Sequence, residues 1–486
     1  MAARGISRAA AWAAGAALAA PLLAPSSAYA HALVGRKDLP IPEWLFAWGA
    51  SVVLIVSFAA LAVLWRSPRL EDEGWRPLPG WVSRALLRKV AETVAGLIGV
   101  ALLGVVIWTG LAGTEQPNAN FSVTFVFVTF WLGVVLLSVL LGDVFRAFNP
   151  WRAIARAVGG AYELIARRPR PEPLPYPERW GRWPAAIGLL AFLWFELVFA
   201  AASESGGVSP RDVALATIAY SALTLFAMSA FGTERWVDRG ETFSVYFGMF
   251  SKLAVFERRG DEIGFRKPLS GARQWAQVPG SAAVVLIAIG GTTFDGAQEG
   301  ALADPIKSAF DWFTERGLGF ADALRITDTL FVVLTLLAVS ALFALGIRGM
   351  RTVPGSPSVV RLRRAFAHSL IPIALAYLVA HYFSLFVFQE QAQFAFLLSD
   401  PLGDGSDYFG TADTSIDYTL LGATAVWYVQ VGALVLGHVA GLVLAHDRAL
   451  VTYSDVRAAT RSQYWMLAVM ISFTCLGLFL LSQANA

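Results

Sequence analysis

The chain has 486 residues, of which 56% are hydrophobic and only 15% are charged. A soluble globular chain carries about 25% charged residues, so this composition excludes an ordinary soluble enzyme. The formal net charge of +3 does not indicate a nucleic-acid partner, because the basic residues are distributed among loops and not gathered in one patch.

The first thirty residues are typical of a secretory signal peptide. Arg4 and Arg8 precede an alanine- and leucine-rich run, and Ala28-Tyr29-Ala30 fits a small-x-small cleavage site. We therefore expect residues 1–30 to be removed. The remaining chain, 31–486, forms a single integral-membrane domain that begins with His31, whose imidazole then lies next to a free α-amine.

The rest of the chain is organised in apolar blocks of about twenty residues, the length needed to cross a ~30 Å hydrocarbon core as a helix. The predicted fold is all-α, a polytopic transmembrane helix bundle in contact with the lipid bilayer. We place its ten spans near 43–65, 92–113, 121–142, 184–203, 212–232, 278–294, 326–347, 365–389, 417–446 and 463–483.

Basic residues orient this bundle. Alternate connecting segments (66–89, 143–183, 233–276, 348–364 and 447–461) contain 30 of the 38 Lys and Arg residues. Under the positive-inside rule, this asymmetry predicts outer N- and C-termini in the cell (inner or plasma) membrane.

Three features of the inner segments carry further expectations. Residues 167–184 are proline-rich and cannot be helical, which predicts an extended connector. Residues 242–256 have aromatic side chains at helical spacing, which predicts an amphipathic helix in the membrane interface. The segments 142–148 and 240–246 are weakly similar, which leaves a duplicated unit and chance similarity as alternatives.

Ionisable residues inside a span cost several kcal/mol unless they face the bundle interior or a wet cavity, so they mark candidate sites. The eighth and ninth spans contain most of them. A Gly437-x-x-x-Gly441 pair in the ninth span would let another helix approach closely. The candidate side chains of these two spans are His368, Tyr377, His381, Ser384, Gln430, His438 and His446.

Three interpretations of these histidines remain open. Haem ligation is disfavoured, because a 13-residue spacing leaves the rings of His368 and His381 ~140° apart on a straight helix. Ligation of a copper or other divalent metal ion is the second interpretation, although HExxH and HxH spacings are absent from the sequence. The third is interhelical hydrogen bonding, with His446-Asp447-Arg448 as an interfacial anchor.

Outer segments add further candidates. A mature N-terminal His31 can chelate copper through its α-amine and one ring nitrogen. Asp295, Asp413 and Asp417 lie among glycines and hydroxyl residues, where a carboxylate can hold a metal ion or activate a water. Asp413 or Ser415 is alternatively a helix cap for the ninth span.

Several long segments of the chain resemble a known family. These are HALVGRKDLPIPEWLFAWGAS, GDVFRAFNPWRAIARAVG, AHSLIPIALAYLVAHYFSLFVFQ, FGTADTSIDY and GHVAGLVLAHDRAL, the last followed by SQYWMLAV. They are similar to a family of actinobacterial multi-pass membrane proteins that carry the name fenitrothion hydrolase. The resemblance covers essentially the whole mature chain, and it implies hydrolysis of an organophosphorus triester with release of a nitrophenol.

The sequence thus supports two predictions from different classes. The first is metal-assisted hydrolysis of a small lipophilic substrate, with Asp295, Asp413 and Asp417 as catalytic carboxylates and a divalent or copper ion as cofactor. The second is a metal transporter or chaperone. The metal ligands that we expect in either case are His31, His381, His438, His368 and His446. Glu196, inside the fourth span, has no role assigned by its sequence context.

Overall fold

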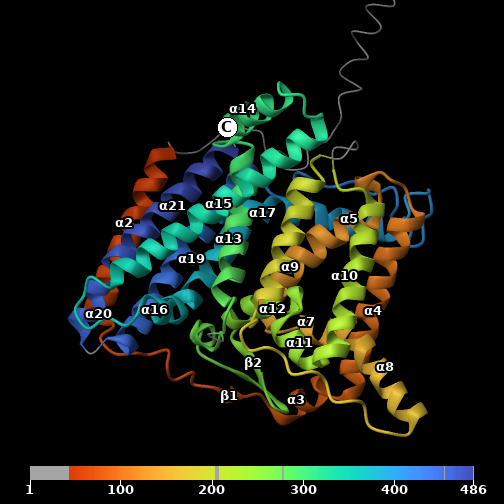
Figure 1. The fold of residues 1–486 in the computed structure, drawn as a ribbon, viewed down its shortest axis with the longest axis horizontal. Coiled ribbons are helices and arrows are strands. Elements are labelled where there is room, and N and C mark those ends of the chain that lie inside the picture. Colours follow the sequence, from red (N-terminus) through yellow and green to blue (C-terminus); the bar gives the residue numbers. More distant parts are fainter. Residues whose placement is uncertain (1–42, 203–206, 276–277, 454, 485–486) are drawn as a thin grey trace, which may run out of the picture.

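The computed structural model describes residues 43–202, 207–275, 278–453 and 455–484, and these ranges are mostly helical (Figure 1). Within them, eight helices are long and apolar enough to cross a membrane: Ala47–Leu64, Lys89–Ala112, Phe121–Leu141, Pro210–Phe231, Phe320–Met350, Val359–Ser399, Ala423–Thr452 and Val456–Leu480. Trp183–Phe199 is a shorter apolar helix. The all-α helical bundle is confirmed, and its long apolar helices indicate a membrane protein, while the count of ten spans and the orientation stay predictions.

The elements of the first half are, in order, α2 (Glu43–Leu64), β1 (Arg76–Pro77), α3 (Gly80–Leu86), α4 (Lys89–Ala112), η3 (Pro117–Ala119), α5 (Phe121–Thr124), η4 (Phe125–Gly133), α6 (Val134–Leu141), α7 (Phe145–Phe148), α8 (Pro150–Ala166), α9 (Trp183–Trp194), η5 (Phe195–Phe199), α10 (Pro210–Phe231), α11 (Thr233–Arg239) and α12 (Thr242–Phe250). Those of the second half are η6 (Ser251–Leu253), β2 (Phe256–Arg259), β3 (Glu262–Phe265), η7 (Ser270–Gln274), α13 (Ser281–Gln298), α14 (Ala303–Thr314), α15 (Phe320–Met350), α16 (Val359–Phe366), η8 (Ala367–Leu370), α17 (Ile371–Phe394), α18 (Phe396–Ser399), α19 (Ala423–Thr452), α20 (Val456–Ser462) and α21 (Tyr464–Ala484).

Helix α13 lies at the centre of the bundle. On one side, α2, α15, α19 and α21 pack together, and α4, α9 and α10 lie on the other side (Figure 1). Helix α13 contacts α9, α15 and α17, while α17 packs along α19 and also contacts η4. The two sides of the bundle therefore meet at α13 and α17.

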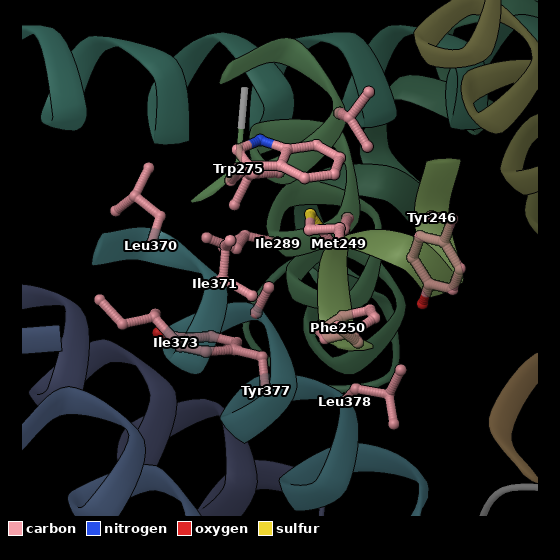
Figure 2. Packing of buried hydrophobic residues seen from close by; sticks show 14 of the residues in the cluster. Tyr246, Met249, Phe250, Trp275, Ile289, Leu370, Ile371, Ile373, Tyr377 and Leu378 are labelled. Carbon is pink, nitrogen blue, oxygen red and sulfur yellow. The ribbon is translucent and has the colours of Figure 1, made fainter. Parts of the chain in front are cut away.

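Helix α12 is buried inside the protein, so the expectation of an interfacial helix over 242–256 is wrong. Eight of its nine residues are buried, and its aromatic rings pack inside the protein. Tyr246 stacks on Trp131 with a 4.3 Å centroid separation, and Phe247 packs edge-on to Phe130 at 5.2 Å. Figure 2 shows Tyr246, Met249 and Phe250 in one apolar cluster with residues of α13 and α17. Both faces of α12 find apolar partners, so burial inside the bundle is favoured over the interface.

The proline-rich segment is free of helix up to Arg182, as predicted, but its last two residues, Trp183 and Pro184, begin α9. It contains no helix or strand between Pro169 and Pro177. Nearby, β1, β3 and β2 form a small antiparallel sheet in that order, with Phe256 paired to Phe265. The sheet lies at the end of the bundle that also holds α3, α16 and α20, opposite α14 (Figure 1).

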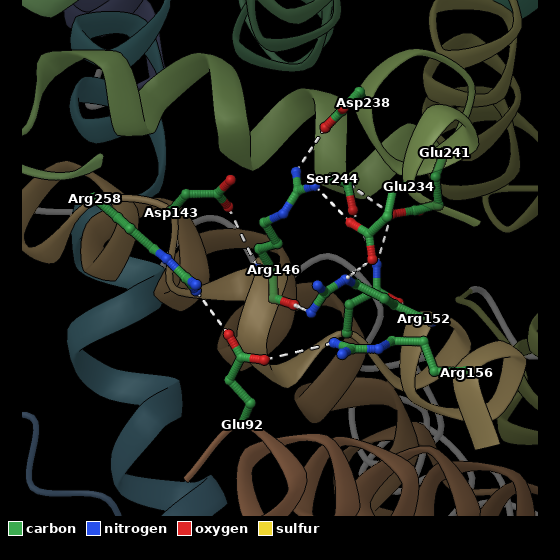
Figure 3. Close-up of polar contacts among 11 residues, drawn as sticks. Glu92, Asp143, Arg146, Arg152, Arg156, Glu234, Asp238, Glu241, Ser244 and Arg258 are labelled. Atoms are coloured by element: carbon green, nitrogen blue, oxygen red, sulfur yellow. Dashed lines mark hydrogen bonds and ion pairs between the residues drawn. The ribbon is translucent and has the colours of Figure 1, made fainter. Parts of the chain in front are cut away.

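An ion-pair network covers part of this end (Figure 3). Arg146 of α7 contacts both Glu234 and Asp238 of α11 at 2.6 Å, and Arg152 contacts Glu234 at 2.8 Å. These side chains are partly exposed, so each pair contributes about 1 kcal/mol or less. The network fixes the orientation of short helices more than it stabilises the whole fold.

The two weakly similar segments are in contact with each other. Helix α7 packs against α12, and the rings of Phe145 and Phe247 are 4.9 Å apart. Asn149 donates from Nδ2 to Glu241 Oε2 over 3.0 Å. Glu241 is fully buried and also accepts from the backbone N–H groups of Phe243 and Ser244 at 2.9 and 2.8 Å. This carboxylate is thus satisfied and caps α12.

Helices α9 and α13 begin side by side, which sets their register. Gly280, with φ of +84°, precedes α13, and a Cβ there would lie 2.5 Å from the backbone nitrogen of Trp183. Arg182 stacks 3.5 Å from the centroid of the Trp275 ring and donates from Nη1 to Ser281 Oγ over 3.0 Å. Burial lowers the pKa of Arg182 to about 10, so it is still a cation at neutral pH.

Candidate functional site

Asp295 occupies the last turn of α13, where a carboxylate opposes the negative end of the helix dipole. Only 3% of the residue is exposed. Upstream, Gly290 and Gly291 allow close packing of Leu336 and Leu193, because a Cβ at either glycine would lie within 2.6 Å of those side chains. Because Asp295 itself is buried, an ionised carboxylate at this position requires protein donors.

Three side chains meet the carboxylate of Asp295. His381 Nε2 lies 2.8 Å from Oδ2, and the Tyr382 hydroxyl donates to the same oxygen over 2.6 Å. Gln298 donates from Nε2 to Oδ1 over 2.7 Å. An ionised carboxylate only accepts hydrogen bonds, so with Asp295 ionised the Nε2 of His381 carries the proton in this pair.

The side chain of His381 is more accessible than that of Asp295. Its side chain is 20% exposed, compared with 2% for Asp295. Gly296 packs beside the imidazole, and a Cβ there would lie 3.3 Å from Nδ1. The ring is therefore held by a buried carboxylate on one edge and faces a residue without a side chain on the other.

Glu196 lies near this cluster. Glu196 lies 13 residues after the start of α9 at Trp183, and Asp295 lies 14 residues after the start of α13 at Ser281. At 1.5 Å per residue, both are about 20 Å from these adjacent helix starts. Glu196 lies close enough to Asp295 and Tyr382 for an electrostatic influence on both. Its Oε2 is buried and has no hydrogen-bond partner within the described part of the chain.

Three of the other predicted histidines, His368, His438 and His446, lie within the described residues, and all three are buried. His446 Nε2 donates to the carbonyl of Trp65 over 3.0 Å, and its Nδ1 accepts from Gln463 Nε2 over 3.2 Å. His438 Nδ1 lies 2.8 Å from the carbonyl of Leu434, and His368 is buried in η8. The interhelical hydrogen bonding expected for His446 is confirmed. A metal ion could bind this ring only if Gln463 or the Trp65 carbonyl gave way.

The residue after His446, Asp447, also joins two distant parts of the chain, while its role as an interfacial anchor stays a prediction. Asp447 Oδ1 accepts from Trp65 Nε1 over 2.9 Å and from the backbone nitrogen of Arg69 over 2.6 Å. It thereby fastens the segment after α2 to the end of α19.

Asp413 and Asp417 are in the exposed segment between α18 and α19. A side-chain hydrogen bond from Thr419 lowers the pKa of Asp417, which keeps it ionised and makes it a weak base. Asp413 and Ser415 do not cap the next helix, because α19 begins only at Ala423 and its N-cap residue is Gly422. The capping interpretation of Asp413 and Ser415 is therefore wrong.

All of the predicted metal ligands except His31 lie within the residues that the structure describes. Among the residues that the structure describes, no three His, Cys, Asp or Glu side chains gather where they could hold a metal ion. Both oxygens of Asp295 already accept hydrogen bonds from protein donors. His31 lies outside the described residues, so a metal site that includes it stays a prediction.

Sequence analysis selected Asp295 and His381 but missed Tyr382 and Gln298. A signal existed for Gln298, which lies three residues after Asp295 on the same helix and so on the same face.

Comparisons with protein-family models, with curated proteins and with solved structures find no match to this chain.

Proposed function

We propose that this protein is a membrane-embedded hydrolase in which His381 is the general base and Asp295 positions it. The observation that supports this proposal most is the 2.8 Å contact between a partly exposed imidazole and a buried carboxylate. The resemblance described above suggests the substrate class, a lipophilic organophosphorus triester.

The chemistry follows from the tautomer that Asp295 imposes. With the Nε2 proton directed at Asp295, Nδ1 is the ring atom that accepts a proton. A carboxylate in this position stabilises the imidazolium that forms during reaction, as in other carboxylate–histidine pairs. Tyr382 and Gln298 hold the carboxylate by donating to its two oxygens.

The proposed step is attack of a water molecule on phosphorus. The water oxygen forms a bond to phosphorus while one of its protons moves to His381 Nδ1. The bond from phosphorus to the aryl oxygen breaks, and the aryloxide leaves with the electron pair. The imidazolium then returns its proton to solvent or to the aryloxide, which completes a balanced hydrolysis.

The described residues do not assemble the metal site that the sequence suggested. Both carboxylate oxygens of Asp295 already have protein hydrogen-bond partners, and Asp413 and Asp417 lie in an exposed loop. We therefore derive no step through a metal ion.

The proposal is tested with the purified full-length protein in detergent and diethyl 4-nitrophenyl phosphate as substrate. Release of nitrophenolate is followed for the wild type and for H381N, D295N and Y382F. General-base catalysis contributes about 10²- to 10⁴-fold. We expect kcat to fall by at least about 100-fold in H381N and D295N, and less in Y382F, which removes only one donor to Asp295.

D413N is the matched control, because it removes an exposed carboxylate and should retain full activity. The pH profile of the wild type should show a base limb that H381N lacks. Equal rates for H381N and the wild type, with both proteins folded, would exclude His381 as the base. Loss of activity in D413N as well would favour the outer-loop carboxylates instead.

A further inference from the structure

A large apolar cavity lies apart from the Asp295 cluster. Its volume is about 1480 Å³, and it is bordered by α4, η4, α6, α9, α10 and the last turns of α17. Leu140, Ile187 and Leu223, which line it, are each more than 60% exposed. Since these residues belong to helices that cross the bilayer or lie along it, the cavity opens sideways toward lipid acyl chains.

Glu390 is the only Asp, Glu, Lys, Arg or His among the described residues that line this cavity. Thr129 donates from Oγ1 to Glu390 Oε2 over 3.1 Å. The other oxygen, Oε1, has no hydrogen-bond partner within the residues that the structure describes. One half of this carboxylate is thus satisfied by protein, and the other half is not.

The backbone around Thr129 also indicates a functional site beside Glu390. Thr129 lies in η4, a π-helix of nine residues that runs from Phe125 to Gly133. π-Helical segments are rare and occur frequently at functional sites. Gly133 faces the carboxylate, because a Cβ there would lie 3.6 Å from Glu390 Oε1. The π-helix therefore presents a hydroxyl and a bare backbone position to Glu390.

The surroundings of Glu390 select the charge of a ligand. An ionised carboxylate in an apolar cavity requires a compensating cation or a hydrogen-bond donor. The described lining contains no Lys, Arg or His, so the lining does not supply that cation. Phe386 and Phe394 lie one turn before and one turn after Glu390 on α17, and Phe130 also lines the cavity. Aromatic faces attract cations and pack well against apolar groups.

We propose that this cavity binds a lipophilic cation, a molecule with an apolar body and a single ammonium or phosphonium charge. The charge lies against Glu390 and the neighbouring aromatic rings, and the apolar body occupies the cavity between α4, α9 and α10. The volume exceeds the roughly 300–1,000 Å³ of ordinary small-molecule pockets, which leaves room for a bulky body. This binding activity goes beyond the proposed hydrolysis and does not depend on it, because the two sites use different residues.

The test uses radiolabelled tetraphenylphosphonium in equilibrium dialysis against the full-length protein in detergent. Tetraphenylborate, an anion of the same shape, reports simple partition into apolar space. We expect saturable binding of the phosphonium alone. In E390Q, affinity should fall at least about tenfold, which corresponds to about 1.4 kcal/mol.

Two variants make the result specific. E390D keeps the charge and should bind better than E390Q. E196Q removes a different buried carboxylate, which does not line the cavity, and should bind like the wild type. Wild-type binding should also strengthen as pH rises, because protons compete with the cation for Glu390.

The proposal is overturned if folded E390Q binds tetraphenylphosphonium as tightly as the wild type, or if tetraphenylborate binds equally well. Either result would identify the cavity as a site filled by lipid chains without charge selection. Loss of binding in E196Q but not in E390Q would overturn the assignment to this cavity in favour of the Asp295 cluster.

Discussion

Gly437 sits where α19 crosses α17, and replacing it with alanine should separate the two helices. A Cβ at this position would lie 2.3 Å from the Cβ of Ala376 and 2.7 Å from the carbonyl oxygen of Pro372. Ordinary contacts of this kind begin at 3.4 Å, so the helices would have to move apart by about 1 Å. Neither obstacle is the flexible end of a side chain, and a rotamer change cannot relieve the clash.

The energetic consequence can be estimated against a matched glycine on the same helix. Overpacking in a core costs about 1–3 kcal/mol, while alanine gains up to about 1 kcal/mol over glycine in helix propensity. Gly432, also in α19, has no atom within 4 Å of its would-be Cβ. G432A should therefore be neutral or stabilising, and G437A should be less stable than G432A by about 2 kcal/mol.

Thermal unfolding of the two variants in one detergent measures this difference directly. We expect G437A to melt several degrees below G432A. Helix α17 also carries His381, five residues after Ala376, so G437A should lower hydrolysis in parallel with stability. If G437A melted at or above the temperature of G432A, the close crossing of α17 and α19 would be refuted.

Three further predictions concern polar contacts. D447A leaves the indole of Trp65 and two backbone N–H groups without their acceptor and should cost about 2–4 kcal/mol, with D447N less affected; unchanged thermal unfolding would contradict the anchor. N149A removes a donor to Glu241 together with the cap of α8, and we expect a loss of about 2–4 kcal/mol in chemical unfolding; a loss under 0.5 kcal/mol would argue against these contacts. D417N should leave nitrophenolate release unchanged, since this exposed carboxylate bonds only within its own loop; a drop of tenfold or more in kcat would disprove that separation.

Sequence reasoning succeeded where the physical signal was local. Helical blocks free of charge predicted the membrane bundle, because hydrophobicity and length are properties of one segment. The Gly437-x-x-x-Gly441 pair predicted close helix packing, which the approach of Pro372 and Ala376 confirms. The prolines of 167–184 predicted an extended segment, since proline removes backbone donors wherever it occurs.

Prediction from the sequence failed where an apolar segment could be buried either in lipid or in protein. The aromatic pattern of 242–256 fits a membrane interface, but α12 is buried because η4 and α9 supply apolar partners. Hydrophobicity states only that a surface leaves water, and it does not choose between lipid and protein. The two π-helices were not foreseen either, because their apolar sequences also fit an ordinary α-helix.

The sequence alone indicated a helical membrane protein, and it singled out His381 inside a span and Asp295 in an outer segment next to a span. The structure places Asp295 inside α13 instead, where it is buried. Only the tertiary structure decided that these two residues form a pair, while Asp413 and Asp417 stay in a separate loop. Asp295 and His381 are 86 positions apart in the sequence, and their contact depends on how α13 and α17 pack. A pairing of this kind is set by the summed packing of whole helices, and no local pattern in either segment encodes it.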